Sequence, residues 1–144
     1  MLNTKLYPPR SFSLHFNGLA RELKSPIRIC VGFDPNKKST LPKPKLESFT
    51  ALWDTGATGV AITQNVINTC NLKPTGMTKV YAAERAYISE TFLINIMLPQ
   101  KIGVPNVTAT KAEAFGFDVL IGMNIITHGD FVITNKDFKT IYSK

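Results

Sequence analysis

The stretch that decides the fold runs from Ala51 to Thr58 and reads Ala-Leu-Trp-Asp-Thr-Gly-Ala-Thr. An apolar run delivers one carboxylate, Asp54, and a hydroxyl and a glycine follow it. Glycine permits a tight turn at the end of a strand, and the Thr55 hydroxyl can hydrogen-bond locally instead of continuing a ladder. An ordinary Asx turn between two strands is the alternative, because a tripeptide is short enough to arise by chance.

A second segment downstream gives the first its context. Residues 118–126 read Asp-Val-Leu-Ile-Gly-Met-Asn-Ile-Ile, an apolar strand that runs into Gly122 and then into a short helix. Nothing in the second half of the chain repeats Asp-Thr-Gly. Four other aspartates lack a following Thr-Gly or Ser-Gly, namely Asp34, Asp118, Asp130 and Asp137. The chain therefore supplies one carboxylate in this setting.

Short β-rich runs recur between turn signals, which predicts an all-β barrel or sandwich. The expected strands are 11–16, 27–33, 49–53, 60–63, 79–83, 91–98, 106–110, 118–121 and 130–134. Two segments look helical: 64–72, with Thr63 as N-cap, and a short turn over 123–128. The Pro- and Lys-containing stretch 34–48 reads as an excursion between two strands.

Together, Asp54-Thr55-Gly56-Ala57 and Leu120-Ile121-Gly122-Met123-Asn124 resemble the retropepsin family of retroviral-like aspartic proteases, in particular its bacterial branch. The resemblance covers roughly residues 49–142, and Met123 stands where retroviral enzymes have Arg. It implies an all-β, closed or partly open barrel of the acid-protease type with one or two short helices. Residues 49–144 would form the catalytic domain, and residues 1–48 would be part of it or a pro-segment.

The resemblance also implies roles for particular residues. Asp54 would be catalytic, and its loop would be supported by Thr55, Gly56, Ala57, Ile121, Gly122 and Asn124. A β-hairpin flap would close over the substrate at Tyr81, Ala82, Ala83, Glu84 and Arg85. Flap tips in the family are glycine-rich, yet this chain has no glycine between Gly76 and Gly103. The tip is thus a stiffer, shorter or differently used flap, or an ordinary solvated turn.

Peptide hydrolysis without a metal or covalent intermediate needs one group to accept a proton and another to donate one. Two carboxylates a few ångströms apart do both, because they cannot both ionise and so share a proton. The missing partner is expected to be Asp54 of a second, identical chain, related by a twofold axis. The run 138–142 is a candidate strand for holding the two chains together, or an edge strand within one chain. No cofactor and no metal are expected.

Two further expectations concern the chemistry of the site. Ala57 replaces the Ser that pepsin-like relatives commonly carry, so no hydroxyl there stabilises the charged carboxylate, and a mildly acidic activity optimum is expected. Substrate preference is expected to be apolar, with five wall residues: Leu52, Val60, Ile62, Val80 and Ile121. An extended peptide would bind as an added strand between the flap and the floor of the site.

Composition sets the outer limits. The chain has 144 residues, 44% of them apolar, which is the size of one ordinary domain. No apolar run is long enough for a membrane span and no signal peptide is evident, so a cytoplasmic location is expected. The two cysteines, Cys30 and Cys70, form no CxxC pair and are expected to be buried free thiols.

The charge of +7 raises the question of a nucleic-acid partner, but only Lys37, Lys38, Lys43 and Lys45 cluster, in a stretch typical of a solvated loop. A small basic barrel that binds single-stranded nucleic acid would need an aromatic platform beside them, and none is evident. Two hypotheses remain: a homodimeric aspartic endopeptidase, and a retropepsin-like module that dimerises or binds a partner without proteolysis. Nucleic-acid and membrane partners are not expected.

Overall fold

The computed structural model describes residues 10–113, 116–134 and 139–143. The described elements, in chain order, are β1 (Ser11–His15), β2 (Leu23–Val31), β3 (Glu47–Trp53), β4 (Val60–Ile62), α1 (Gln64–Thr69), β5 (Gly76–Tyr81), β6 (Ala86–Leu98), a 3₁₀ turn (Pro99–Lys101), β7 (Ile102–Lys111), β8 (Val119–Ile121), α2 (Met123–Ile126), β9 (Asp130–Thr134) and β10 (Lys139–Ser143). The expected all-β class with two short helices is confirmed.

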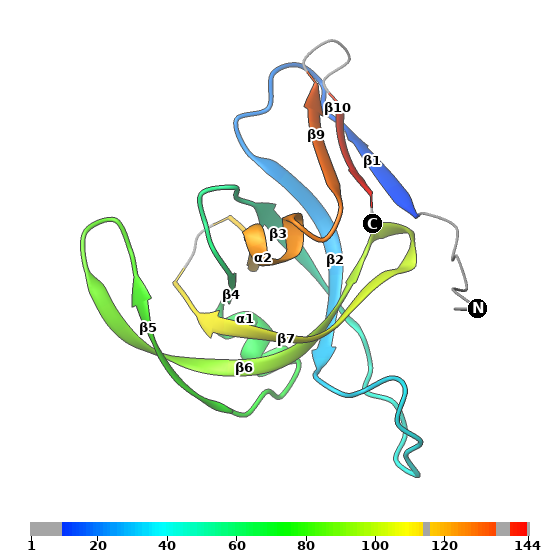
Figure 1. The fold of residues 1–144 in the computed structure, drawn as a ribbon, viewed down its shortest axis with the longest axis vertical. Helices are drawn as coiled ribbons and strands as arrows, with labels where there is room; N and C mark the ends of the chain where they lie inside the picture. Colours follow the sequence, from blue (N-terminus) through cyan, green and yellow to red (C-terminus); the bar gives the residue numbers. More distant parts are fainter. Residues whose placement is uncertain (1–9, 114–115, 135–138, 144) are drawn as a thin grey trace, which may run out of the picture.

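Six strands close into a barrel in the order β2-β3-β8-β4-β7-β6, because β2 also pairs with β6. β5 pairs only with β6 among the described strands, and the β5–β6 hairpin extends away from the barrel wall (Figure 1). Closure satisfies the backbone groups that an open sheet would leave at its edges.

Alternating apolar residues of these strands fill the barrel. Ile29, Ile62, Ile94 and Ile121 are fully buried, together with Phe92. Each lies on a strand where alternate residues face the same side, so one face of every strand points inward. The strand pattern seen in the sequence therefore reflects a single closed core.

A separate three-stranded sheet stands beside the barrel, in the order β1-β10-β9, with all pairings antiparallel (Figure 1). β10 is its middle strand, paired with β1 on one side and β9 on the other. The run 138–142 was expected to be a strand that holds two chains together or an edge strand within one chain. The edge alternative is wrong because β10 has a neighbour on each side, and the dimer alternative stays a prediction. The outer strands are β1 and β9.

Both helices begin where the sequence predicts, and both are shorter than expected. Thr63 is the N-cap of α1, although its side chain makes no capping hydrogen bond. The helix ends at Thr69, and Asn71 then adopts a positive φ of 49°. The expected helix over 123–128 ends at Ile126, with Gly129 soon after it.

The two cysteines are free thiols, as expected. Cys30 is buried, and Cys70 is partly buried with its Sγ donating to the carbonyl of Ile29 at 3.5 Å. Burial raises the pKa of Cys30, and it raises the pKa of Cys70 to about 11, with smaller contributions from Glu47 and Cys30. Both thiols therefore hold their protons at neutral pH.

The segment between β2 and β3 is a loop without strands, and the four clustered lysines in it are exposed, as expected for a solvated excursion. In the part of the chain that the structure describes, no helix combines the length and the apolar character needed to cross a membrane.

Candidate active site

Asp54 is the first residue after β3, and its loop is held by short hydrogen bonds. Its backbone N–H donates to the carbonyl of Ile121 at 2.9 Å, which continues the β3–β8 ladder by one residue. Its carboxylate Oδ1 accepts from the Gly56 N–H at 2.8 Å, and its carbonyl accepts from the Ala57 N–H at 3.2 Å. The carboxylate is thus fixed at the start of a tight turn and stays partly exposed.

The strand order around Asp54 explains why two distant sequence segments meet. β8 lies between β3 and β4, parallel to the first and antiparallel to the second. The chain leaving β8 therefore passes directly against the loop that joins β3 to β4. At this crossing the Met123 N–H donates to the Ala57 carbonyl at 2.8 Å, and the Asn124 N–H donates to the Thr58 carbonyl at 3.0 Å.

Gly122 occupies the closest point of this crossing. A Cβ at this position would lie 2.8 Å from the Ala57 carbonyl oxygen and equally close to the Gly59 nitrogen, and it would collide with the Gly59 carbonyl oxygen. All three atoms belong to the backbone, so no side-chain movement relieves the overlap. A glycine is required here because two backbone segments of the same chain approach each other closely.

The other residues expected to support the loop are distributed around it. Ile121 is fully buried in the barrel, whereas Thr55 and Gly56 are exposed. Ala57 is partly buried, and Asn124 is exposed and contacts the loop through its backbone N–H. The residues predicted to support the loop therefore lie in it or against it in the folded chain.

A second carboxylate, that of Asp118, lies near the same strands and is already engaged. Its Oδ2 accepts from the Thr50 N–H at 2.9 Å and its Oδ1 accepts from Asn65 Nδ2 at 3.0 Å. Its own backbone joins β3 through Thr50 and α1 through Thr63. Asp118 thus ties β3, β8 and α1 together, which explains why an acidic residue directly precedes the apolar strand β8.

A cleft of about 570 Å³ lies between the Asp54 loop and the β5–β6 hairpin. Its lining comes from the loop and β4, from the hairpin, from the end of β7 and from β8: Gly56, Ala57, Thr58, Gly59, Val60, Ala61, Thr78, Lys79, Val80, Tyr81, Tyr87, Thr108, Thr110, Ala112 and Leu120. Val80 and Tyr87 are cross-strand partners, and both are partly buried on the side of the hairpin that lines this cleft.

The hairpin tip lies at the residues that the sequence indicates. β5 ends at Tyr81 and β6 begins at Ala86, and the Ala82 N–H donates to the Arg85 carbonyl at 2.9 Å. The tip residues Ala82, Ala83, Glu84 and Arg85 are all exposed. The Arg85 guanidinium lies 5.9 Å from the centre of the Tyr87 ring, a cation–π contact at the base of the tip.

The wall residues expected from the sequence are only partly correct. Val60 and Val80 line the cleft, but Ile62 and Ile121 are fully buried in the barrel core and have no surface for a substrate. Leu52 does not line the cleft.

Sequence reasoning missed Tyr87, Thr108, Thr110, Ala112 and Leu120 as lining residues. A signal for the threonines was present, because they alternate with the buried Val107 and Ala109 along one strand.

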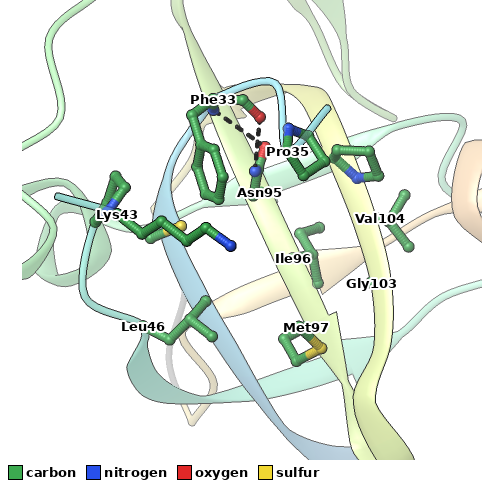
Figure 2. A pocket seen from close by; sticks show the side chains of 12 residues that line it. Phe33, Pro35, Lys43, Leu46, Asn95, Ile96, Met97, Gly103 and Val104 are labelled. Carbon is green, nitrogen blue, oxygen red and sulfur yellow. Dashed lines mark hydrogen bonds between the residues drawn. The ribbon is translucent and has the colours of Figure 1, made fainter. Parts of the chain in front are cut away.

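Another cavity, of about 360 Å³, shares no lining residue with this cleft. Figure 2 shows this second cavity from close by. It is enclosed by the β2–β3 loop and by the far ends of β6 and β7, and Phe33, Leu46 and Met97 make its walls largely apolar. The Asn95 side chain in its lining is already hydrogen-bonded. Its Nδ2 donates to the Phe33 carbonyl, and its Oδ1 accepts from the backbone N–H groups of Phe33 and Asn106. Lys43 is its charged group, so it lacks the carboxylate chemistry of the Asp54 loop.

Within the described ranges, no group of three or more His, Cys, Asp or Glu side chains is placed to hold a metal ion. At the Asp54 loop, the structure places a partly exposed carboxylate beside a cleft, with backbone amides holding it in place.

Residues 46–128 match the family model described as gag-polyprotein putative aspartyl protease. The chain belongs to this family. The matched range contains the Asp54 loop, the hairpin and the Gly122 crossing, so the elements that build the site are those on which membership rests. A search of the curated proteins finds no match to this sequence.

A solved structure shows the same fold. The chain is similar to a retropepsin-like aspartic protease from Rickettsia conorii, with a TM-score of 0.60 and 15% identity over 94% of this chain and 92% of that chain. It is also matched to the retroviral protease-like domain of Ddi1 from Leishmania major, with a TM-score of 0.43 and 12% identity over 77% and 81% of the two chains. The retropepsin-like fold predicted from the sequence is confirmed.

Proposed function

We propose that this protein is an aspartic endopeptidase that acts as a homodimer, with one Asp54 from each chain forming the catalytic pair. The observation that carries the proposal is the placement of Asp54, the only Asp-Thr-Gly aspartate of the chain, at a hydrogen-bonded turn beside a cleft of about 570 Å³. Membership of a putative aspartyl protease family gives independent support.

The proposed reaction follows from the chemistry of two close carboxylates. Like charges a few ångströms apart cannot both ionise, so the pair holds one proton between its members. The ionised carboxylate takes a proton from a water molecule, whose oxygen attacks the peptide carbonyl carbon, while the protonated carboxyl donates its proton to the carbonyl oxygen. The tetrahedral intermediate then breaks its C–N bond: the carboxyl that took the water proton passes it to the leaving nitrogen, and the other carboxylate takes back the proton from the carbonyl oxygen. No metal or covalent intermediate enters this scheme.

The surrounding residues would hold the two Asp54 side chains in position. Thr55, exposed beside Asp54, is proposed to hydrogen-bond across the dimer axis, and Gly56 donates its N–H to the carboxylate. Ala57, Gly122 and Asn124 fix the loop through the backbone contacts at the crossing, and Ile121 anchors it in the core. These groups position Asp54 and take no part in proton transfer.

The β5–β6 hairpin is proposed to act as a flap over a bound peptide. Its tip, over residues Tyr81–Arg85, is exposed, while Val80 and Tyr87 at its base line the cleft. An extended peptide lying between hairpin and loop would meet mostly hydroxyl and small side chains, including Thr78 and Thr108. A protein or peptide substrate is the class of ligand that such a slot accepts.

A second candidate function is a dimerising or partner-binding module without proteolysis. The observation that favours it is the absence of glycine from the hairpin tip, since glycine is what lets a flap backbone approach a substrate.

The experiment that separates the two compares wild-type protein with Asp54→Asn on a peptide library, from strongly acidic to neutral pH. The endopeptidase proposal expects cleavage by the wild type and none by the variant, with the dimer preserved in both. Absence of Asp54-dependent cleavage across the whole range would reject it in favour of the module.

A further inference from the structure

The cavity between the β2–β3 loop and the far ends of β6 and β7 has the dimensions of a small-molecule site. Its volume is about 360 Å³. Ligand sites in proteins are concave, mostly apolar spaces of roughly 300–1,000 Å³ that carry a few polar groups. Here the loop contributes Phe33 and Leu46 to the walls, and the two strands contribute Ile96, Met97 and Val104. Both the size and the lining therefore suit a largely apolar ligand.

The loop wall of this cavity is fixed by Asn95, whose residue is only 8% exposed. Its Nδ2 donates to the Phe33 carbonyl at 2.9 Å, and its Oδ1 accepts from the Asn106 N–H at 2.9 Å. Asn95 lies at the point where the register between β6 and β7 shifts. One side-chain amide thus joins the start of the loop to both strands. A wall that is already in place lowers the entropic cost of binding a ligand.

The one charged side chain in the lining of the cavity is that of Lys43. Figure 2 shows it extending from the loop into the space between the apolar walls. Within the part of the chain that the structure describes, Lys43 makes no ion pair, whereas Lys45 pairs with Glu47 at 3.0 Å. No acidic residue lines the cavity, and the Asp34 carboxylate of the adjoining hollow accepts from the Asn36 N–H at 2.9 Å. An unpaired positive charge therefore stands beside an apolar space.

We propose that this cavity binds a small amphipathic monocarboxylate, with its apolar chain between the loop and the ends of β6 and β7 and its carboxylate on the Lys43 ammonium. The charge favours an anion, and the apolar walls disfavour a fully polar anion such as phosphate because its desolvation is costly.

The volume of the cavity sets the length of the ligand. With about 30 Å³ for each non-hydrogen atom, the volume of one water molecule, 360 Å³ holds roughly twelve atoms, as in a saturated carboxylate of about eight to ten carbons. The cavity shares no lining residue with the cleft beside Asp54, so the inference does not depend on the proposed proteolysis.

The first test is NMR of protein labelled at the methionine methyl groups, with octanoate as the probe. Met97 lines the cavity, whereas Met123 begins α2 beside the Asp54 loop. Octanoate is expected to shift the Met97 signal until it saturates and to leave the Met123 signal in place. A Met97 signal that does not move at about 10 mM octanoate, a concentration that detects even weak ligands, would overturn the proposal. A shift at Met123 in place of Met97 would also overturn it.

The charge is tested with Lys43→Met, which keeps an apolar stem, and with the matched control Lys45→Met. Lys45 lies in the same loop and does not line the cavity. The affinity of Lys43→Met for octanoate is expected to fall about three- to tenfold, while Lys45→Met binds like the wild type. Octylamine, which has the same chain and the opposite charge, is expected to bind the wild type at least about tenfold more weakly than octanoate. Equal losses in the two variants, or equal binding of the two probes, would contradict the role of Lys43.

The apolar walls are tested on the wild type alone, so that no variant has to fold. From butanoate through hexanoate to octanoate, affinity is expected to rise about two- to fourfold for each added methylene, because each one leaves water for the cavity. An affinity that does not change with chain length would show that the carboxylate meets only a surface lysine, and the cavity would then be rejected as the binding site.

Discussion

The ring of Trp53 stacks on the ring of Phe131, with centroids 5.6 Å apart and planes inclined by 23°. Trp53 is the last residue of β3 and Phe131 lies in β9, so the contact joins the barrel to the outer sheet one residue before Asp54. Phe12 of β1 contacts the same indole, with centroids 6.0 Å apart. One side chain thus links the candidate catalytic loop to both outer strands of the small sheet.

Replacement of Trp53 should therefore weaken the contact between the barrel and the small sheet as well as the core. The indole is 6% exposed, and its Nε1 donates to Ser25 Oγ at 2.8 Å. Trp53→Ala is expected to lower the free energy of unfolding by about 3–5 kcal/mol, as for other buried aromatic truncations. Trp53→Phe, the matched control, keeps a stacked ring and should lose less. Equal losses in urea unfolding of the two variants would contradict the stacking argument.

Gly122→Ala is expected to displace the Asp54 loop, because its new methyl group would overlap backbone atoms of Ala57 and Gly59. The expected result is a lower melting temperature and loss of any Asp54-dependent cleavage. Gly59→Ala serves as a control on the other side of the crossing, since nothing lies within 4 Å of a Cβ there. Thermal unfolding of both variants checks the prediction, and a Gly122→Ala protein as stable as the control would refute it.

Removal of residues 1–48 is expected to unfold the domain. That segment contains β2, which pairs with both β3 and β6 and so closes the barrel. Deletion of residues 1–9 alone leaves every described strand in place and should preserve the fold. Circular dichroism and solubility of the two truncations distinguish a pro-segment from an integral part of the domain; a folded, soluble 49–144 fragment would favour the pro-segment.

The buried thiols predict a pH dependence at the alkaline end. The folded-state pKa of Cys70 is raised to about 11 from an ordinary value of 9.0, mainly by burial. A raised thiol pKa means that the unfolded chain releases its proton first, so this contribution to stability is present below pH 9 and is lost as pH rises towards 11. The difference in unfolding free energy between wild type and Cys70→Ser should shrink over this range. If the difference in unfolding free energy between wild type and Cys70→Ser did not change with pH, the raised pKa of Cys70 would be contradicted.

The sequence predicts the fold and the position of the Asp54 loop because their constraints are local. The first pattern is Asp54-Thr55-Gly56 at the end of a strand, and the second is Gly122 directly after an apolar strand. Each pattern can be recognised from a few consecutive residues. Alternation and turn signals indicate where most strands lie, although β2 and β7 each begin four residues before the expected starts at 27 and 106. The parallel β3–β8 pairing that brings the two patterns together appears only in three dimensions.

Other features depend on tertiary context and could not be read from the sequence. Alternation places Ile62 and Ile121 on an inward face but does not tell a barrel core from a substrate cleft, so both were wrongly placed in the cleft wall. β6 begins at Ala86, five residues before the expected Thr91, because pairing with β5 extends it through exposed residues. β10 is a middle strand only because β1 and β9 flank it.

The central claim is that two chains must each supply Asp54, and subunit mixing tests it most directly. Wild-type protein is held at constant concentration while an excess of Asp54→Asn is added and the subunits are allowed to exchange. Mixed dimers carry one carboxylate, so the cleavage rate should fall towards about one tenth at a roughly ninefold excess of the variant. A rate that does not change as the variant is added would show that one chain suffices and would contradict the account.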